Sequence, residues 1–114
     1  SNSNLNNIKK WVKSSHWIDF LAENPKTISS TSICLKLIDP LIINESIDIK
    51  NKVEKNIVQL LEKEKVAYDI GSYRSAPPGL RIWGGPTIES EDIKFLLPWL
   101  DWAYSETLKQ LNID

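Results

Sequence analysis

The chain has 114 residues and sets 14 Lys plus Arg against 15 Asp plus Glu, for a formal net charge of −1. This length supports one domain over residues 1–114 and does not support two independent ones. With 41% apolar and 25% charged residues, the composition is typical of a globular chain. No apolar stretch reaches the ~18 residues of a membrane span, and nothing resembles a signal peptide. The single Cys34 excludes internal disulfides and Cys-based zinc sites and favours a reducing, cytoplasmic environment.

Three segments carry the apolar spacing of helices. The first covers about residues 5–21 and stops before Asn24-Pro25, a pair typical of turns. The second runs from residue 48 or 50 to residue 64, with a face rich in Lys and Glu that we expect to be solvated. The third begins at Ser90, an expected N-cap, and Pro98 within it predicts a kink or a restart.

Three other segments favour strands. Residues 27–37 alternate between apolar and polar positions, and the apolar set is Ile33, Leu35 and Leu37. Residues 66–70 and 80–83 are shorter candidates joined by a loop at 71–79, which suggests that these two strands pair with each other in antiparallel fashion. The order helix, strand, helix, strand, strand, helix predicts an α+β two-layer sandwich, in which helices cover a small, mainly antiparallel sheet.

Most familiar catalytic and binding patterns are missing. The only histidine, His16, is expected at the surface or in packing, because no second His is present to form a metal cluster or a Cys–His nucleophile system. Gly-rich phosphate loops and dinucleotide fingerprints are absent, and a net charge near zero without a basic stripe argues against nucleic acid. Four of the five tryptophans lie in apolar helical segments and are expected to pack in the core or at an interface: Trp11, Trp17, Trp99 and Trp102.

The two arginines are the compositional exception, because Arg74 and Arg81 lie within one window of eight residues in a chain whose other basic residues are lysines. A guanidinium offers a planar fork for carboxylate or phosphate. The intervening Pro77-Pro78 stiffens the loop, and Gly79 permits close backbone approach. In one interpretation, both arginines form an anion site. In the other, Arg81 is an ordinary surface residue of a strand and Arg74 is an ordinary charged residue of a loop.

Residues 68–89, with the sequence YDIGSYRSAPPGLRIWGGPTIE, resemble the C-terminal domain of the phosphoserine aminotransferase family, in the branch found in alphaproteobacteria and their relatives. The motif LPWLDWA at residues 97–103 continues the resemblance, and residues 17–22 and 31–36 carry weaker echoes. The chain departs from the family pattern at Ser75, where an acidic residue is usual, and at residues 84–85, where it is richer in glycine.

The resemblance implies a fold type I pyridoxal-phosphate enzyme that transfers the amino group of glutamate to 3-phosphohydroxypyruvate, giving phosphoserine and 2-oxoglutarate. By similarity, Arg81 binds the substrate α-carboxylate, and Arg74, with Tyr73, holds the substrate phosphate or the distal carboxylate of glutamate. The Schiff-base lysine and the other cofactor contacts belong in this family to a large upstream domain. We therefore expect no catalytic, cofactor-binding or metal-binding residue here, and residues 1–24 as the helix that links to the large domain.

As an isolated fragment, such a chain should hold no cofactor and be inactive, whereas the full-length enzyme is expected to be a homodimer acting on dianionic substrates. Two other hypotheses remain open from the sequence. The chain could be a stand-alone module that binds an anionic metabolite through Arg74 and Arg81, or a structural domain that forms a domain or dimer interface.

Overall fold

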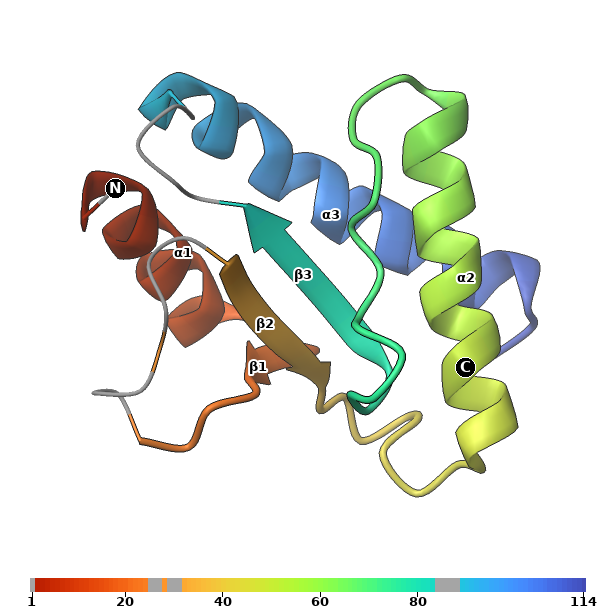
Figure 1. Ribbon diagram of the computed structural model, residues 1–114. Coiled ribbons are helices and arrows are strands. Elements are labelled where there is room, and N and C mark those ends of the chain that lie inside the picture. Colours follow the sequence, from red (N-terminus) through yellow and green to blue (C-terminus); the bar gives the residue numbers. More distant parts are fainter. Residues whose placement is uncertain (1, 25–27, 29–31, 84–88) are drawn as a thin grey trace.

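A three-stranded antiparallel sheet and three helices make up the fold in the computed structural model, which describes residues 2–24, 28, 32–83 and 89–114 (Figure 1). The elements are α1 (Asn2–Ser14), β1 (Ile18–Phe20), β2 (Ser32–Leu37), α2 (Ile47–Lys63), β3 (Gly79–Trp83) and α3 (Ser90–Gln110). This arrangement confirms the small α+β fold expected from the sequence. Three parts of the sequence interpretation lie outside the described residues: Pro25, the expected strand positions 27 and 29–31, and the glycines at 84–85.

The sheet has the strand order β1-β2-β3, and both pairings are antiparallel. Strand β2 lies in the centre, with Ile18 opposite Leu37 on one side and Cys34 opposite Arg81 on the other. The alternation along the strands buries one face of the sheet through Ile18, Ile33, Leu35, Leu37, Leu80 and Ile82. The opposite face, called the open face below, carries side chains that are half-buried or exposed: Asp19, Ser32, Cys34, Lys36, Arg81 and Trp83.

The apolar face of the sheet forms one core with the helices. Helix α3 packs against both α1 and α2 and extends across the molecule from one to the other (Figure 1). Helix α2 begins at the N-cap Ser46, whose side chain accepts the Ile49 N–H at 3.2 Å, and buries Val53, Ile57 and Leu61. No helix among the described residues is both long and apolar enough to cross a membrane.

The expected first helix over residues 5–21 is wrong in its second half. Helix α1 ends at Ser14, and residues 18–20 form strand β1 instead. The Ser15 hydroxyl accepts the Trp17 N–H at 3.2 Å, which turns the chain between the two elements. Pairing with β2 then satisfies backbone hydrogen-bonding groups of β1. This tertiary contact outweighs the helix-like spacing of the apolar residues in this segment.

The expected strand at residues 66–70 is also absent, so its expected pairing with residues 80–83 is wrong. Only one isolated bridge, Gly71 to Leu80, joins this region to β3, and the Arg81 N–H donates to the Ile70 carbonyl at 2.8 Å. Positive φ angles of 60° at Lys65 and 55° at Asp69 interrupt the extended conformation that a strand needs. Strand β3 pairs with β2 instead, although α2 lies between these two strands in the sequence.

Helix α3 differs from expectation at its start. Its N-cap is Glu89, which makes no side-chain capping bond, and Ser90 is the first helical residue rather than the cap. The helix runs as one element through Pro98, so the restart considered from the sequence does not occur. Pro98 lies on the exposed side, where the missing backbone donor leaves a carbonyl that water can reach.

Candidate functional site

Arg81 projects from a strand that is held very close to its neighbour. A Cβ atom at Gly79 would lie 1.9 Å from the Leu35 carbonyl oxygen, so only glycine fits where β3 begins against β2. The Gly79 N–H donates to Glu54 Oε1 of α2 at 2.8 Å, and the Ser72 hydroxyl donates to the same oxygen at 2.7 Å. Glu54 therefore anchors both ends of the loop that carries Tyr73 and Arg74.

Aromatic rings flank the Arg81 guanidinium on the open face. Its Cζ lies 4.2 Å from the centre of the Tyr73 ring and 5.3 Å from that of Trp83. One amino group, Nη2, donates to the Asp69 carbonyl at 3.2 Å. The Nε donor is buried and has no hydrogen-bond partner within the described part of the chain. A buried donor left unpaired costs free energy.

Tyr73 is tied to the sheet by its hydroxyl, which shares a hydrogen bond of 3.0 Å with the hydroxyl of Ser32. The bond to Ser32 lowers the pKa of the Tyr73 phenol below its ordinary value, and Arg81 lowers it further. The ring itself is 42% exposed, so a ligand can reach its edge. The structure thus brings together two of the three residues expected at the site, Tyr73 and Arg81.

Arg74, the third expected residue, lies in an exposed turn closed by the Ala76 N–H, which donates to the Tyr73 carbonyl at 2.9 Å. The structure describes no hydrogen bond or ion pair for the Arg74 side chain among residues 2–24, 28, 32–83 and 89–114. Its guanidinium is therefore displayed to solvent next to the residue that stacks on Arg81. The joint role of Arg74 and Arg81 stays a prediction.

A groove of about 450 Å³ runs beside Arg81, between α2 and the loop after it. Three carboxylates line it, from Glu54, Glu62 and Asp69, against the cations Lys55 and Arg81. This balance does not suit an anion, because the nearby carboxylates would repel it. The open face, where the rings of Tyr73 and Trp83 lie, is the better approach for an anionic ligand.

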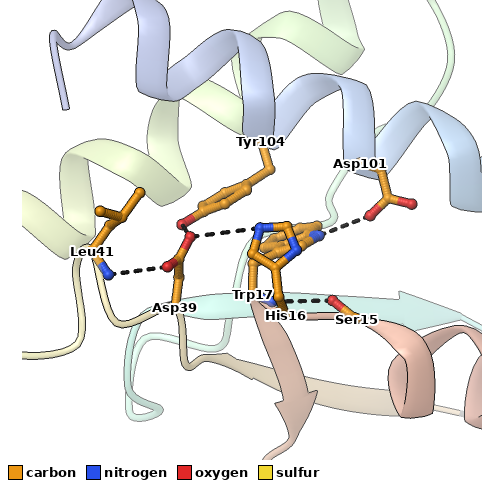
Figure 2. Close-up of polar contacts among 7 residues, drawn as sticks. All are labelled: Ser15, His16, Trp17, Asp39, Leu41, Asp101 and Tyr104. Carbon is orange, nitrogen blue, oxygen red and sulfur yellow. Dashed lines mark hydrogen bonds and ion pairs between the residues drawn. The ribbon is translucent and has the colours of Figure 1, made fainter. Parts of the chain in front are cut away.

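A second polar cluster, which the sequence did not suggest, surrounds Asp39 (Figure 2). Asp39 is 3% exposed, and its carboxylate accepts the Tyr104 hydroxyl at 2.6 Å and the Leu41 N–H at 3.0 Å. His16 Nε2 lies 3.8 Å from the same carboxylate, while the His16 side chain is 77% exposed, in agreement with the expected surface position. Burial and the bond to Asp39 raise the pKa of Tyr104 above its ordinary value.

Asp101 on α3 forms the other half of this cluster (Figure 2). Its two carboxylate oxygens accept the indole N–H groups of Trp11 at 2.9 Å and Trp17 at 2.8 Å. The Trp17 ring stacks on Tyr104 with 4.2 Å between centres and 6° between planes. These contacts join α1, the start of β1, the segment after β2 and α3. The sequence shows only that Asp101 and Tyr104 have helical spacing. It could not show their hydrogen-bond partners, because these lie 65 or more residues away.

The remaining helical tryptophans belong to an aromatic patch on α3. Trp99 meets Trp102 edge to face with 5.3 Å between centres, and Phe95 stacks near Trp99 at 6.3 Å. Phe95 is 54% and Trp102 is 39% exposed. Trp17 has the core position expected for it, whereas this patch is a cluster of large apolar side chains at the surface.

The structure is thus a small α+β domain in which β3 carries one stacked arginine, Arg81, and the loop before it carries one exposed arginine, Arg74. Comparison with known proteins points to a class, the aminotransferases. The chain is 47% identical over 105 residues to the phosphoserine aminotransferase of Methanosarcina barkeri, covering 92% of this chain and 26% of that relative. It is 47% identical over 104 residues to the phosphoserine aminotransferase of Methanosarcina mazei, covering 91% of this chain and 25% of that relative.

No protein-family model and no solved structure matches the chain. The resemblance to phosphoserine aminotransferases is confirmed by the curated relatives over nearly the whole chain. The chain spans only about a quarter of the length of these relatives, 26% and 25%.

Proposed function

We propose that this chain is the C-terminal small domain of a phosphoserine aminotransferase. The full-length enzyme would transfer the amino group of glutamate to 3-phosphohydroxypyruvate, as a homodimer in the cytoplasm. The observation that carries the proposal is the mounting of Arg81, whose guanidinium is stacked between two rings on the open face of the sheet. The similarity to two enzymes of that name supports it.

The proposed substrates suit the chemistry of the loop, because each carries two anionic groups. In this proposal, Arg81 binds the α-carboxylate through its planar fork of N–H donors. Arg74, displayed in the neighbouring turn, binds the phosphate or the distal carboxylate, with Tyr73 as the adjacent residue of the same loop. Each charge-assisted contact of this kind contributes about 1.5–3 kcal/mol.

Pyridoxal phosphate, which the family uses, does not fit the residues described here. A Schiff-base lysine needs a desolvated pocket that lowers its pKa, but the described lysines are exposed apart from the half-buried Lys36 and Lys50. A helix N-terminus can hold a phosphate, but the first turn of α2 carries Asp48 and that of α3 carries Glu91 and Asp92; α1 has no acidic residue in its first turn. We therefore assign the cofactor to a large domain outside this chain, to which residues 1–24 would lead.

The open reading frame that contains this chain provides the test. The proposal expects a longer product whose upstream part supplies a cofactor-binding lysine, and expects that product to form phosphoserine from glutamate and 3-phosphohydroxypyruvate. The 114-residue chain alone should show no aldimine absorption band after incubation with pyridoxal phosphate. A frame that encodes only this chain, together with binding of an anionic metabolite by the chain, would replace the proposal with the stand-alone binding module.

The aromatic patch on α3 favours an additional interface role. The exposed Phe95 and Trp102 flank the half-buried Trp99 and form with it an aromatic surface of the kind that proteins bury against another domain or subunit. In the proposed enzyme this surface would pack against the larger aminotransferase domain. In limited proteolysis, Trp102→Ser should therefore increase the rate of cleavage between the two domains of the enzyme. Lys94→Ser, an exposed control on the same helix, should leave that rate unchanged.

A further inference from the structure

The Arg81 side chain is held by three contacts within this chain. The Asp69 carbonyl accepts one of its amino groups at 3.2 Å, and the rings of Tyr73 and Trp83 lie on it at 4.2 Å and 5.3 Å. Loss of rotamer freedom on binding is a large cost for arginine. A guanidinium that is already ordered avoids most of that cost when an anion binds.

The contact of Tyr73 with Arg81 depends on a hydrogen bond that holds Tyr73 in place. Its ring comes from an exposed loop, yet its hydroxyl bonds the Ser32 hydroxyl at 3.0 Å. Ser32 lies on β2 directly opposite Trp83 of β3. The ring of Tyr73 is therefore held over the guanidinium from one strand, while Arg81 and Trp83 project from the next.

We propose that Tyr73 is a positioning residue, which orients the Arg81 guanidinium for the substrate carboxylate and is itself held by the hydroxyl of Ser32. This inference rests on the proposed function, and it refines the role of Tyr73 from a direct ligand contact to one exerted through Arg81. Three observations support it: the short distance from ring to guanidinium, the Ser32 tether, and the burial of Arg81 Nε under its neighbours. The lowered pKa of the Tyr73 phenol has the same two causes, Ser32 and Arg81.

Kinetics of the full-length enzyme separate a positioning role from direct binding. Tyr73→Leu should raise KM for 3-phosphohydroxypyruvate by about 3- to 10-fold with little change in kcat, the size expected for loss of a cation–π contact. In an enzyme that already carries Arg81→Lys, the same change should have almost no further effect, because both substitutions remove one function. Fully additive losses would overturn the proposal, since Tyr73 would then act on the substrate independently of Arg81. The control is Tyr68→Leu, an exposed tyrosine of the same segment.

Nuclear magnetic resonance of the 114-residue chain tests the geometry without any enzymatic activity. The chain contains only two arginines, so its spectrum has two arginine Nε–H signals. The buried Arg81 Nε–H should be shifted by the ring current of Tyr73 and exchange slowly, while Arg74, in its exposed turn, should show the shift of a solvated side chain.

Tyr73→Leu should move the Arg81 signal toward that of Arg74 and speed its exchange by about 10-fold or more. Tyr73→Phe keeps the ring but loses the tether, so it and Ser32→Ala should give intermediate shifts, and Tyr68→Leu should leave both signals in place. An Arg81 signal that is unchanged in Tyr73→Leu would overturn the positioning role. If the parent enzyme lacks transaminase activity while these shifts occur, the proposed function fails and the geometric part of the inference stands.

Discussion

Glu54 Oε1 accepts the Gly79 N–H at 2.8 Å, although the two residues lie 25 positions apart in the chain. The same oxygen accepts the Ser72 hydroxyl at 2.7 Å. One carboxylate on α2 thus closes the loop that presents Tyr73 and Arg74 and fixes the start of the strand that presents Arg81. This carboxylate therefore helps to fix the position of the candidate site on the fold.

Removing the Glu54 anchor should loosen the loop and lower stability. Glu54→Ala leaves the half-buried Gly79 N–H without a partner, and we expect its free energy of unfolding to fall by about 2–3 kcal/mol in urea denaturation. Glu54→Gln, which keeps an acceptor oxygen, should cost roughly half as much. Glu62→Ala, an exposed carboxylate on the same helix, serves as the control. Equal stability of the Glu54 and Glu62 variants would contradict the anchoring role.

Gly79 should tolerate no side chain. Gly79→Ala places a Cβ 1.9 Å from the Leu35 carbonyl oxygen, which is backbone and cannot rotate away. We expect a loss of about 3 kcal/mol or more, because the two strands must separate to relieve the contact. Gly71→Ala is the matched comparison, since its Cβ would meet the flexible end of Glu54 at 3.1 Å. Thermal unfolding should therefore show a much larger decrease in Tm for Gly79→Ala, and similar decreases in both variants would refute the packing argument.

The Tyr104–Asp39 bond predicts a loss of stability at alkaline pH. The pKa of Tyr104 is raised in the folded chain, so the protonated phenol contributes stability that is fully present below pH ~10 and is lost as the pH rises beyond that value. Tyr104→Phe cannot ionise, so it should be less stable near neutrality, by about 1–3 kcal/mol, but should lose less on going to high pH. Unfolding measured across the alkaline range checks both signs.

Tyr73 should ionise earlier than Tyr104 in a spectroscopic titration. The pKa of Tyr73 is lowered by the Ser32 hydrogen bond and by Arg81, with desolvation opposing, whereas that of Tyr104 is raised by burial and Asp39. We expect an ultraviolet phenolate transition that begins below the ordinary tyrosine pKa and disappears in Tyr73→Phe. Arg81→Gln should move this early transition to higher pH. No change in that variant would mean that Tyr73 and Arg81 are not in contact.

Local patterns in the sequence were sufficient for the elements that are long and regularly spaced. Helix α2 and the alternation of Ile33, Leu35 and Leu37 in β2 follow directly from apolar period. Strand β1, with three residues, has no pattern of its own and exists because β2 pairs with it. Residues 66–70 had the composition of a strand, but the positive φ angles at Lys65 and Asp69 depend on the way the chain leaves α2.

The candidate site was predictable in part. The two arginines and the rigid loop between them were visible in the sequence, and so was the position of Arg81 on a strand. The stacking of Tyr73 on Arg81, however, requires the loop to fold back over β3, and the tether to Ser32 joins residues 41 positions apart. The Asp39–Tyr104 bond spans 65 positions. Contacts at such separations arise from the tertiary fold and leave no local period.

The most direct test of the central claim is the kcat/KM of Arg81→Lys for 3-phosphohydroxypyruvate, measured in the full-length enzyme that carries this chain. Lysine keeps the charge but loses the planar fork, so we predict a fall of about 30- to 150-fold, equivalent to about 2–3 kcal/mol, with cofactor absorption unchanged. A variant with nearly normal kcat/KM would contradict the assignment of Arg81 to the substrate carboxylate.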